Sequence, residues 1–276
     1  MENDRLKALL KLLSTETDSY GTVLRKEIAA AFKANPTGVR TVLKETFREE
    51  TPLPVVHTLE EIAWEELSAA LAHFATKINP DLEEGLTLLS KFTVSTTSRL
   101  EVTILLDEIA RALRPGLLNA RNYSEIARTL SHYFFNTLGL QILPVTWDIQ
   151  EIAFSRFLHK HRGSSLCVAC LYVLICQRYG VDAGLVDLAG RILVHLKGPQ
   201  ESVFIDPLDN GKILSQDDCR QYIASRQLDW NDNFLTPLSS RQTIRRFIAN
   251  MIFISNKIHD ERRLVFLRRY LDIMQN

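Results

Sequence analysis

A chain of 276 residues is long enough for one or two domains and for a packed core that needs no disulfide or metal ion to hold it together. Hydrophobic residues make up 46% of the chain and charged residues 24%, which are ordinary values for a globular protein and exclude a disordered one. Because 33 basic side chains balance 33 acidic ones, the net charge excludes a general attraction to nucleic acid or acidic membranes.

No segment of the sequence predicts export or membrane insertion. The N-terminus carries charged residues where a signal peptide would have an apolar stretch. The longest unbroken apolar run, over residues 166–176, is too short to cross about 30 Å of hydrocarbon. Three of the four cysteines lie inside that run, as expected for reduced, buried thiols. We therefore expect a cytoplasmic protein without membrane association.

Apolar residues recur at three- and four-residue spacing through much of the first 140 residues, which is the pattern of amphipathic helices. Several predicted helices start with a residue that can cap a helix N-terminus, followed by acidic residues, because carboxylates favour the positive end of the helix dipole. We therefore expect a helical domain over residues 1–140. Its predicted helices are three within residues 4–48, one from Thr58 to Thr76 with Thr58 as its cap, one that starts at Asn79-Pro80-Asp81 with proline in the first helical position, and two over residues 99–113 and 122–136.

The pattern changes after residue 140, and six of the eleven glycines fall within residues 163–211. Because glycine marks turns and strand ends, this region should contain the strands. We predict an α+β core over residues 141–235 and a helical segment over residues 236–276. The predicted elements are helices over 151–160 and 163–179, the latter ending at Gly180, strands over 183–188, 192–197 and 202–206, a turn at Asn210-Gly211, a helix capped by Ser215, and helices over 239–258 and 260–274.

Several short motifs in this core resemble one family in order and spacing. They are Arg162-Gly163-Ser164-Ser165-Leu166, Gly190-Arg191-Ile192-Leu193-Val194 and Ile205-Asp206-Pro207-Leu208-Asp209-Asn210-Gly211. The set resembles the bacterial SirB-type branch of the transglutaminase-like superfamily, whose motifs run Arg-Gly-Ile-Pro-Ile-Ser-Leu, Gly-His-Phe-Leu-Val and Ile-Asp-Pro-Phe-Asn-Gly-Gly. The resemblance implies an α+β, predominantly helical fold with a helical N-terminal part, a papain/transglutaminase-like core of a buried helix plus a small antiparallel sheet, and C-terminal helices.

Active members of this superfamily use papain-like cysteine chemistry. A thiolate at the start of the core helix attacks, a histidine on the following strands takes the proton, and an aspartate orients that histidine. Carried over by position, these roles fall on Ser165, Arg191 and Asp206, so only the aspartate is retained. An arginine stays protonated at neutral pH and cannot act as a general base. The resemblance therefore implies a degenerate cleft at these three residues, with a structural Arg191–Asp206 ion pair.

Two further residues could supply the missing chemistry from displaced positions. Cys167 lies two residues beyond the nucleophile position, which is roughly 200° around a helix. His195 shares the strand face of Arg191 but lies about 13 Å further along the strand, so a catalytic pairing with Asp206 would need a shifted register. The structural alternatives are a buried thiol and a satisfied sheet histidine.

The sequence predicts no cofactor and no metal site. Cys167 and Cys170 form a Cys-X-X-Cys pair, but a second ligand pair is missing and the surrounding helix is apolar. His159 and His161 alternate at a helix end and do not converge on one ligand point. We interpret the cysteines as buried small side chains and the histidines as part of a solvated basic segment.

The last part of the chain is basic, with eight basic and three acidic side chains in residues 241–276. Such charges usually form a solvated helix face. An anionic partner such as nucleic acid would use Arg245, Arg246, Arg262 and Arg263, although the aromatic residues here are not interleaved for stacking on bases.

Three functions follow as hypotheses. The leading one is a non-catalytic transglutaminase-like protein, a pseudoenzyme that acts as a protein-binding or regulatory module and whose partner is another protein or a peptide. The second is a cysteine-dependent amidase or transglutaminase with Cys167 as displaced nucleophile and His195 as displaced base. The third is a regulator that binds an anionic partner through the C-terminal helices.

Overall fold

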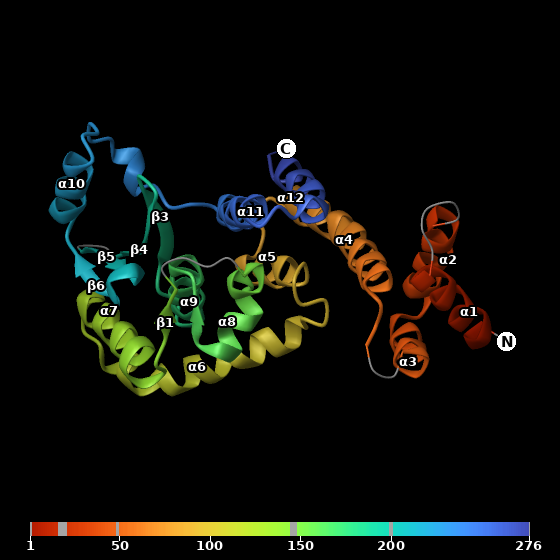
Figure 1. The fold of residues 1–276 in the computed structure, drawn as a ribbon. Coiled ribbons are helices and arrows are strands. Elements are labelled where there is room, and N and C mark those ends of the chain that lie inside the picture. Colours follow the sequence, from red (N-terminus) through yellow and green to blue (C-terminus); the bar gives the residue numbers. More distant parts are fainter. Residues whose placement is uncertain (1, 16–20, 48–49, 144–147, 199–200, 276) are drawn as a thin grey trace. The chain divides into compact units, whose positions relative to one another are not determined.

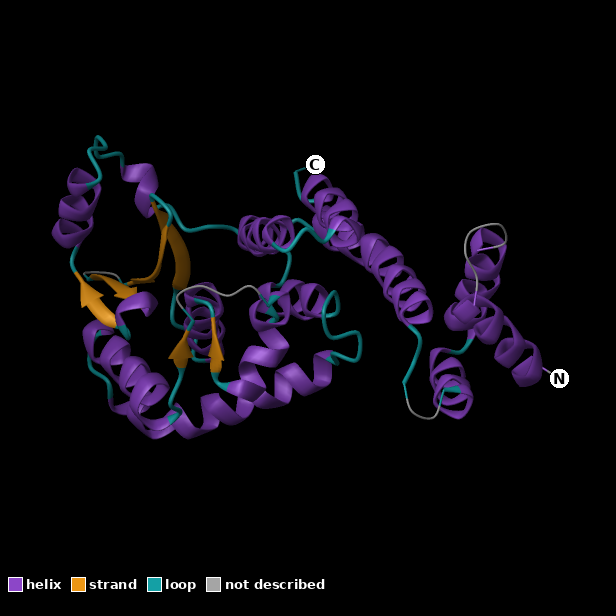
Figure 2. Ribbon diagram, viewed as in Figure 1, coloured by secondary structure: helices purple, strands orange, loops and turns teal. Residues whose placement is uncertain are grey.

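The computed structural model contains twelve α-helices within the residues that it describes, together with a four-stranded antiparallel sheet and a short two-stranded parallel ladder (Figure 1). Helices predominate over strands (Figure 2), and the described strands lie between Gln141 and Leu214, so the α+β, predominantly helical fold expected from the sequence is confirmed. Within the described residues, no helix combines the length and the apolar composition that crossing a membrane requires. The described residues are 2–15, 21–47, 50–143, 148–198 and 201–275.

The chain divides into two compact units, Met1–Leu67 and Ser68–Asn276. The sequence-based boundaries near residues 140 and 235 divide the chain at other places and stay predictions about domains. Each unit is described by itself.

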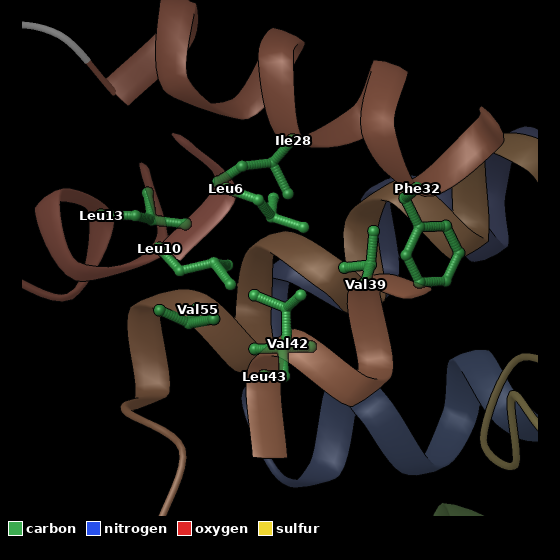
Figure 3. Packing of buried hydrophobic residues seen from close by; sticks show 9 residues of the cluster. All are labelled: Leu6, Leu10, Leu13, Ile28, Phe32, Val39, Val42, Leu43 and Val55. Atoms are coloured by element: carbon green, nitrogen blue, oxygen red, sulfur yellow. The ribbon is translucent and has the colours of Figure 1, made fainter. Parts of the chain in front are cut away.

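The first unit is built from amphipathic helices that share one apolar core, shown in Figure 3. Leu10 of the first helix and Ile28 of the second have no exposed surface. The third helix is capped by Asn35, whose side chain accepts a hydrogen bond from the Gly38 amide at 2.8 Å. The three helices predicted within residues 4–48 are confirmed. The helices of this unit are α1 (Glu2–Thr15), α2 (Gly21–Ala34), α3 (Pro36–Thr46) and the first part of α4 (Leu53–Thr76).

The expected start of α4 at Thr58 is wrong, because the helix begins five residues earlier at Leu53. Pro54 lies in the first turn, where the missing proline N–H costs no helical hydrogen bond. The Thr58 hydroxyl is buried inside the helix and donates to the Pro54 carbonyl at 2.9 Å, so it does not cap the helix.

The helices that precede the sheet follow the predicted order with different ends. One expected to start at Pro80 starts instead at Leu82, with Asp81 as its cap. Another, predicted to end at residue 113, continues through Pro115 to Asn119. The segment predicted over 151–160 divides at Ala153 into a 3-10 turn and a short α-helix. These elements are α5 (Leu82–Ser90), α6 (Arg99–Asn119), α7 (Tyr123–His132), the π-helical turn η1 (Tyr133–Thr137), the 3-10 turn η2 (Ile149–Ile152) and α8 (Phe154–Lys160).

The core of the second unit is an apolar helix and an antiparallel meander. Residues 166–176 are buried all round the helix, which explains their unbroken apolar run. The helix begins at Ser165 with Ser164 as its cap, two residues after the expected start. A fourth strand, missed because it has only three residues, extends the three predicted ones. The elements are α9 (Ser165–Arg178), β3 (Ala183–Leu188), β4 (Arg191–Lys197), β5 (Ser202–Asp206) and β6 (Lys212–Leu214), with β1 (Gln141–Ile142) and β2 (Arg162–Gly163) as the parallel ladder.

The turn between β5 and β6 is the predicted Asn210-Gly211 turn. Both residues have positive φ, 50° and 77°, a conformation that asparagine and glycine adopt most readily. The Gly211 amide donates to the Asp206 carbonyl at 2.9 Å. The Ser131 hydroxyl donates to the Gly211 carbonyl at 3.0 Å and thereby ties α7 to the turn. This turn fixes the chain immediately after the candidate aspartate.

Three helices follow the sheet, and two of them start with reciprocal caps, of which the one at Ser215 is the predicted cap. Ser215 pairs with Asp218, and Ser239 pairs with Gln242, so that each cap residue and the third helical residue satisfy one another's amide. The 3-10 turn η4 (Asp232–Leu235) lies between the first two helices, which are α10 (Gln216–Ser225) and α11 (Ser240–Lys257), and the last is α12 (Glu261–Ile273).

Candidate functional site

Side chains alternate between the two faces of a strand, and this alternation assigns the candidate residues of the sheet to one face. Arg191 and His195 share a face of β4. His195 pairs with Phe204 of β5, so Phe204 and Asp206, which is two residues further along β5, lie on the same face of the sheet. The apolar residues of this face, Leu193 and Phe204, form one buried cluster with residues of α10. Because α9 also contacts β3 and β4 but contributes nothing to that cluster, we infer that α9 packs against the opposite face.

The expected ion pair between Arg191 and Asp206 is present. Asp206 has no exposed surface, and its second carboxylate oxygen accepts a hydrogen bond from the Leu208 amide at 2.9 Å. The Arg191 side chain keeps 28% of its surface exposed, and its guanidinium lies 5.1 Å from the centre of the Tyr222 ring. Of the two charged groups, only the arginine is therefore open to a ligand.

The charged pair affects a cysteine of α10. The pKa of Cys219 is raised to about 11, mainly by burial and also by Asp218 and Asp206, while Arg191 opposes the shift. A thiol with such a pKa stays protonated at neutral pH. Cys219 belongs to the apolar cluster beneath α10 and acts there as a small hydrophobic side chain.

Ser165, which occupies the family's nucleophile position, is the first residue of α9 and is half-buried. The neighbouring Ser164 caps the helix and accepts a hydrogen bond from the Cys167 amide at 3.3 Å. In the described part of the chain, no imidazole or carboxylate is hydrogen-bonded to the Ser165 hydroxyl. This serine therefore lacks the adjacent base that would make it a nucleophile.

The displaced nucleophile candidate, Cys167, has no exposed surface. Its thiol donates to the Ile152 carbonyl at 3.4 Å and accepts from the Ser164 hydroxyl at the same distance. Burial raises the pKa of Cys167 to about 11, although the hydrogen bonds from Ser164 lower it. Burial also raises the pKa of Cys170 well above its usual value and that of Cys176 to about 12.

The displaced base candidate, His195, is buried and stacks on Phe204, with ring centres 4.5 Å apart. Its Nε2 lies 3.3 Å from the Ser202 hydroxyl, and its Nδ1 is a buried nitrogen without a hydrogen-bond partner. Burial and the nearby Lys197 lower the pKa of His195, while Asp182 opposes them. Neither ring nitrogen is hydrogen-bonded to Cys167 or Asp206 in the described residues, so the structure brings no displaced catalytic pair together.

Sequence reasoning missed a charged group beside the start of α9. Glu151 is 6% exposed, and its carboxylate accepts a hydrogen bond from the Arg162 guanidinium at 2.8 Å. That hydrogen bond, with the charges of Arg162 and Arg156, lowers the pKa of Glu151 against the effect of burial. Arg162 lies eleven positions after Glu151, and no local periodicity connects the two residues, so the sequence carries no signal for this contact.

The charged residues at the C-terminal end are partly engaged by the protein itself. Arg246 pairs with Asp187 at 2.7 Å, and Arg263 pairs with Asp260 at 3.1 Å. Among the described residues, no group of three or more histidine, cysteine, aspartate or glutamate side chains could hold a metal ion.

Comparison with known families matches residues 101–249 to the transglutaminase-like superfamily. Searches of curated proteins and of solved structures gave no significant match. The matched segment covers more than half of the chain and includes α9, the sheet and all five candidate residues. The chain therefore belongs to the transglutaminase-like superfamily.

Proposed function

We propose that this transglutaminase-like protein is a non-catalytic member of the SirB-type branch and acts as a protein-binding or regulatory module. The observation that carries the proposal is the ion pair between Arg191 and the buried Asp206. In active relatives these strand positions hold a histidine and the aspartate that orients it. A guanidinium cannot take the proton of a nucleophile at neutral pH.

The thiols add to this argument. With a pKa of about 11, Cys167 is a thiolate in about one molecule in ten thousand at pH 7, and its side chain has no exposed surface. An attacking thiolate would have to reach a bulky amide substrate from inside the protein. The buried cysteines therefore stabilise the core and take no part in chemistry.

A bound peptide would contact the exposed residues at the superfamily's site positions, which lie at the start of α9 and on the sheet face that α10 covers. Ser165 and Arg191 keep accessible surface, whereas Asp206 has none. Asp206 thus holds Arg191 in position, and Arg191 and Ser165 are the groups that a protein partner can reach.

Catalysis is tested by incubating the protein with a glutamine-containing protein and a fluorescent primary amine, and by measuring amine incorporation and ammonia release. For both the wild-type protein and Cys167→Ala, we expect no more amine incorporation and no more ammonia release than in a control reaction without the protein. Turnover that Cys167→Ala abolishes would support the cysteine enzyme and refute the proposal.

Thiol reactivity is tested with iodoacetamide at pH 7 and mass spectrometry of each cysteine. We expect slow alkylation of Cys167, Cys170, Cys176 and Cys219 in the folded protein, and fast alkylation of all four in urea. Rapid modification of a single cysteine in the folded protein is the contrary result.

Binding is tested on an array of random 15-residue peptides. We expect peptides that bind the wild-type protein to bind more weakly to Ser165→Trp, which places a bulky side chain at the start of α9, and to Arg191→Gln. The control Arg220→Gln on α10 should leave their affinity unchanged. Binding that is unchanged in both variants, or no bound peptide at all, would refute these positions as the binding site.

A further inference from the structure

A surface pocket of about 400 Å³, open to solvent and called the cavity below, lies between α6, α7 and the π turn η1, away from the five candidate residues of the superfamily fold. Its volume is within the range of small-molecule sites. The α6 wall is apolar and is formed by Ala112, Leu113 and Gly116. The opposite wall is polar and is formed by residues of α7 and η1.

Both walls of this cavity interrupt regular helix geometry. In η1 the Leu138 amide bonds to the Tyr133 carbonyl at 2.7 Å, a five-residue step that places Tyr133 and Thr137 on the cavity. Such π turns occur frequently at functional sites. On the other side, Pro115 has no N–H and so leaves the Arg111 carbonyl without its helical hydrogen bond.

The polar wall carries an arginine and a histidine without partners among the described residues. Arg128 and His132 are one helical turn apart on α7 and face the same way. Within the described residues, neither makes an ion pair or a side-chain hydrogen bond, and no carboxylate lines the cavity. The nearest acid along the helix, Glu125, is engaged by the Arg121 amide at 2.7 Å. Arg178 of the same unit, by contrast, is paired with Glu83 at 2.8 Å.

We propose that this cavity binds a small oxyanion, a carboxylate or a phosphate ester, that is attached to an apolar group. The planar guanidinium of Arg128 presents two parallel donors, which fit two oxygens of either anion. His132 and the Tyr133 hydroxyl supply further donors at the same wall. The apolar part of the ligand packs against Ala112 and Leu113. The proposal is independent of the non-catalytic function, because it uses none of the candidate cleft residues.

The site is tested by titrating the whole protein with phenyl phosphate and with benzoate, using calorimetry and amide chemical shifts. Inorganic phosphate and phenol serve as the charged and apolar halves of the probes. We expect at least one aromatic anion to bind ten times more tightly than either half, with shifts concentrated in α6, α7 and η1. The preferred anion identifies the source, a phosphate ester or a carboxylate.

Two variants and a matched control separate this site from general electrostatics. Arg128→Gln should weaken binding at least tenfold, and Ala112→Trp should abolish it by filling the cavity while leaving Arg128 and His132 in place. Arg114→Gln removes the same charge from α6 outside the cavity and should change affinity less than twofold. The proposal is overturned if neither anion binds wild type, if Arg114→Gln and Arg128→Gln have equal effects, or if Ala112→Trp binds normally.

Discussion

The start of α9 and the sheet face covered by α10 hold complementary sets of reactive side chains. At the start of α9, Ser165 and Cys167 could be nucleophiles, but neither is hydrogen-bonded to a base in the described residues. On the sheet face, Asp206 could orient a base, but it pairs with Arg191. The difference shows that residue types alone do not make a catalytic site, because strand register and burial decide which groups meet.

The largest effect is expected on the sheet face. Arg191→Met leaves the carboxylate of Asp206 buried without a counter-charge, which should lower the free energy of unfolding by about 3 kcal/mol. Urea denaturation at pH 7 measures the loss. Lys212→Met removes an exposed pairing with Asp209 and should cost less than about 0.5 kcal/mol.

A second substitution tests the cause of that loss. Adding Asp206→Asn to Arg191→Met removes the unpaired charge and should restore part of the stability, although the amide cannot replace the ion pair. If Arg191→Met alone lowers the free energy of unfolding no more than the Lys212→Met control does, the Arg191–Asp206 pair has no structural role.

At the start of α9, Glu151→Gln should cost about 1 kcal/mol at pH 7, because both arginine partners are partly exposed and weaken the effect. The pKa of Glu151 is lowered on folding, so its ionisation stabilises the protein above about pH 4.5, and this contribution is lost as the pH falls through the lower folded pKa. Denaturation curves of both proteins should therefore converge on acidification. A constant difference down to pH 3 would contradict the assigned cause.

The same region allows a direct test of the thiol. Cys167→Ala removes a buried side chain and its hydrogen bond to the Ile152 carbonyl, with an expected cost of roughly 1 kcal/mol. Cys167→Ser should also destabilise the protein, because the hydroxyl is smaller and more polar. An equilibrium unfolding series with both variants measures the effect; a more stable Cys167→Ala protein would indicate that the cysteine is kept for another purpose.

The smallest effect is expected at His195, where burial lowers the pKa on folding. As the pH falls, the imidazole of His195 is protonated in the unfolded chain before it is protonated in the folded protein. Its contribution to the free energy of unfolding is therefore fully present above about pH 6.5 and declines as the pH falls toward the lower folded pKa. His195→Gln should remove that part of the pH dependence. An unchanged slope between pH 7 and pH 5 would show that another group is responsible.

Local signals in the sequence were sufficient for most elements of the core. Gly180 ends α9 with positive φ, and Asn210-Gly211 forms the turn, because few other residues adopt these conformations without strain. The caps at Ser215 and Ser239 were also predictable, since each is satisfied by a residue three positions away. The expected cap at Thr58 failed because a proline two residues into the helix marks an earlier start.

The amino-acid sequence by itself determined the helical periodicity and the turn-rich core. It also determined that an arginine, which cannot act as a base, occupies the strand position where the superfamily has its histidine. Only the tertiary structure decided that the Cys167 thiol donates to the Ile152 carbonyl and that Glu151 meets Arg162. The first group of properties depends on neighbours within a few residues. The second depends on contacts that form only when distant segments pack and exclude water, and no local pattern encodes them.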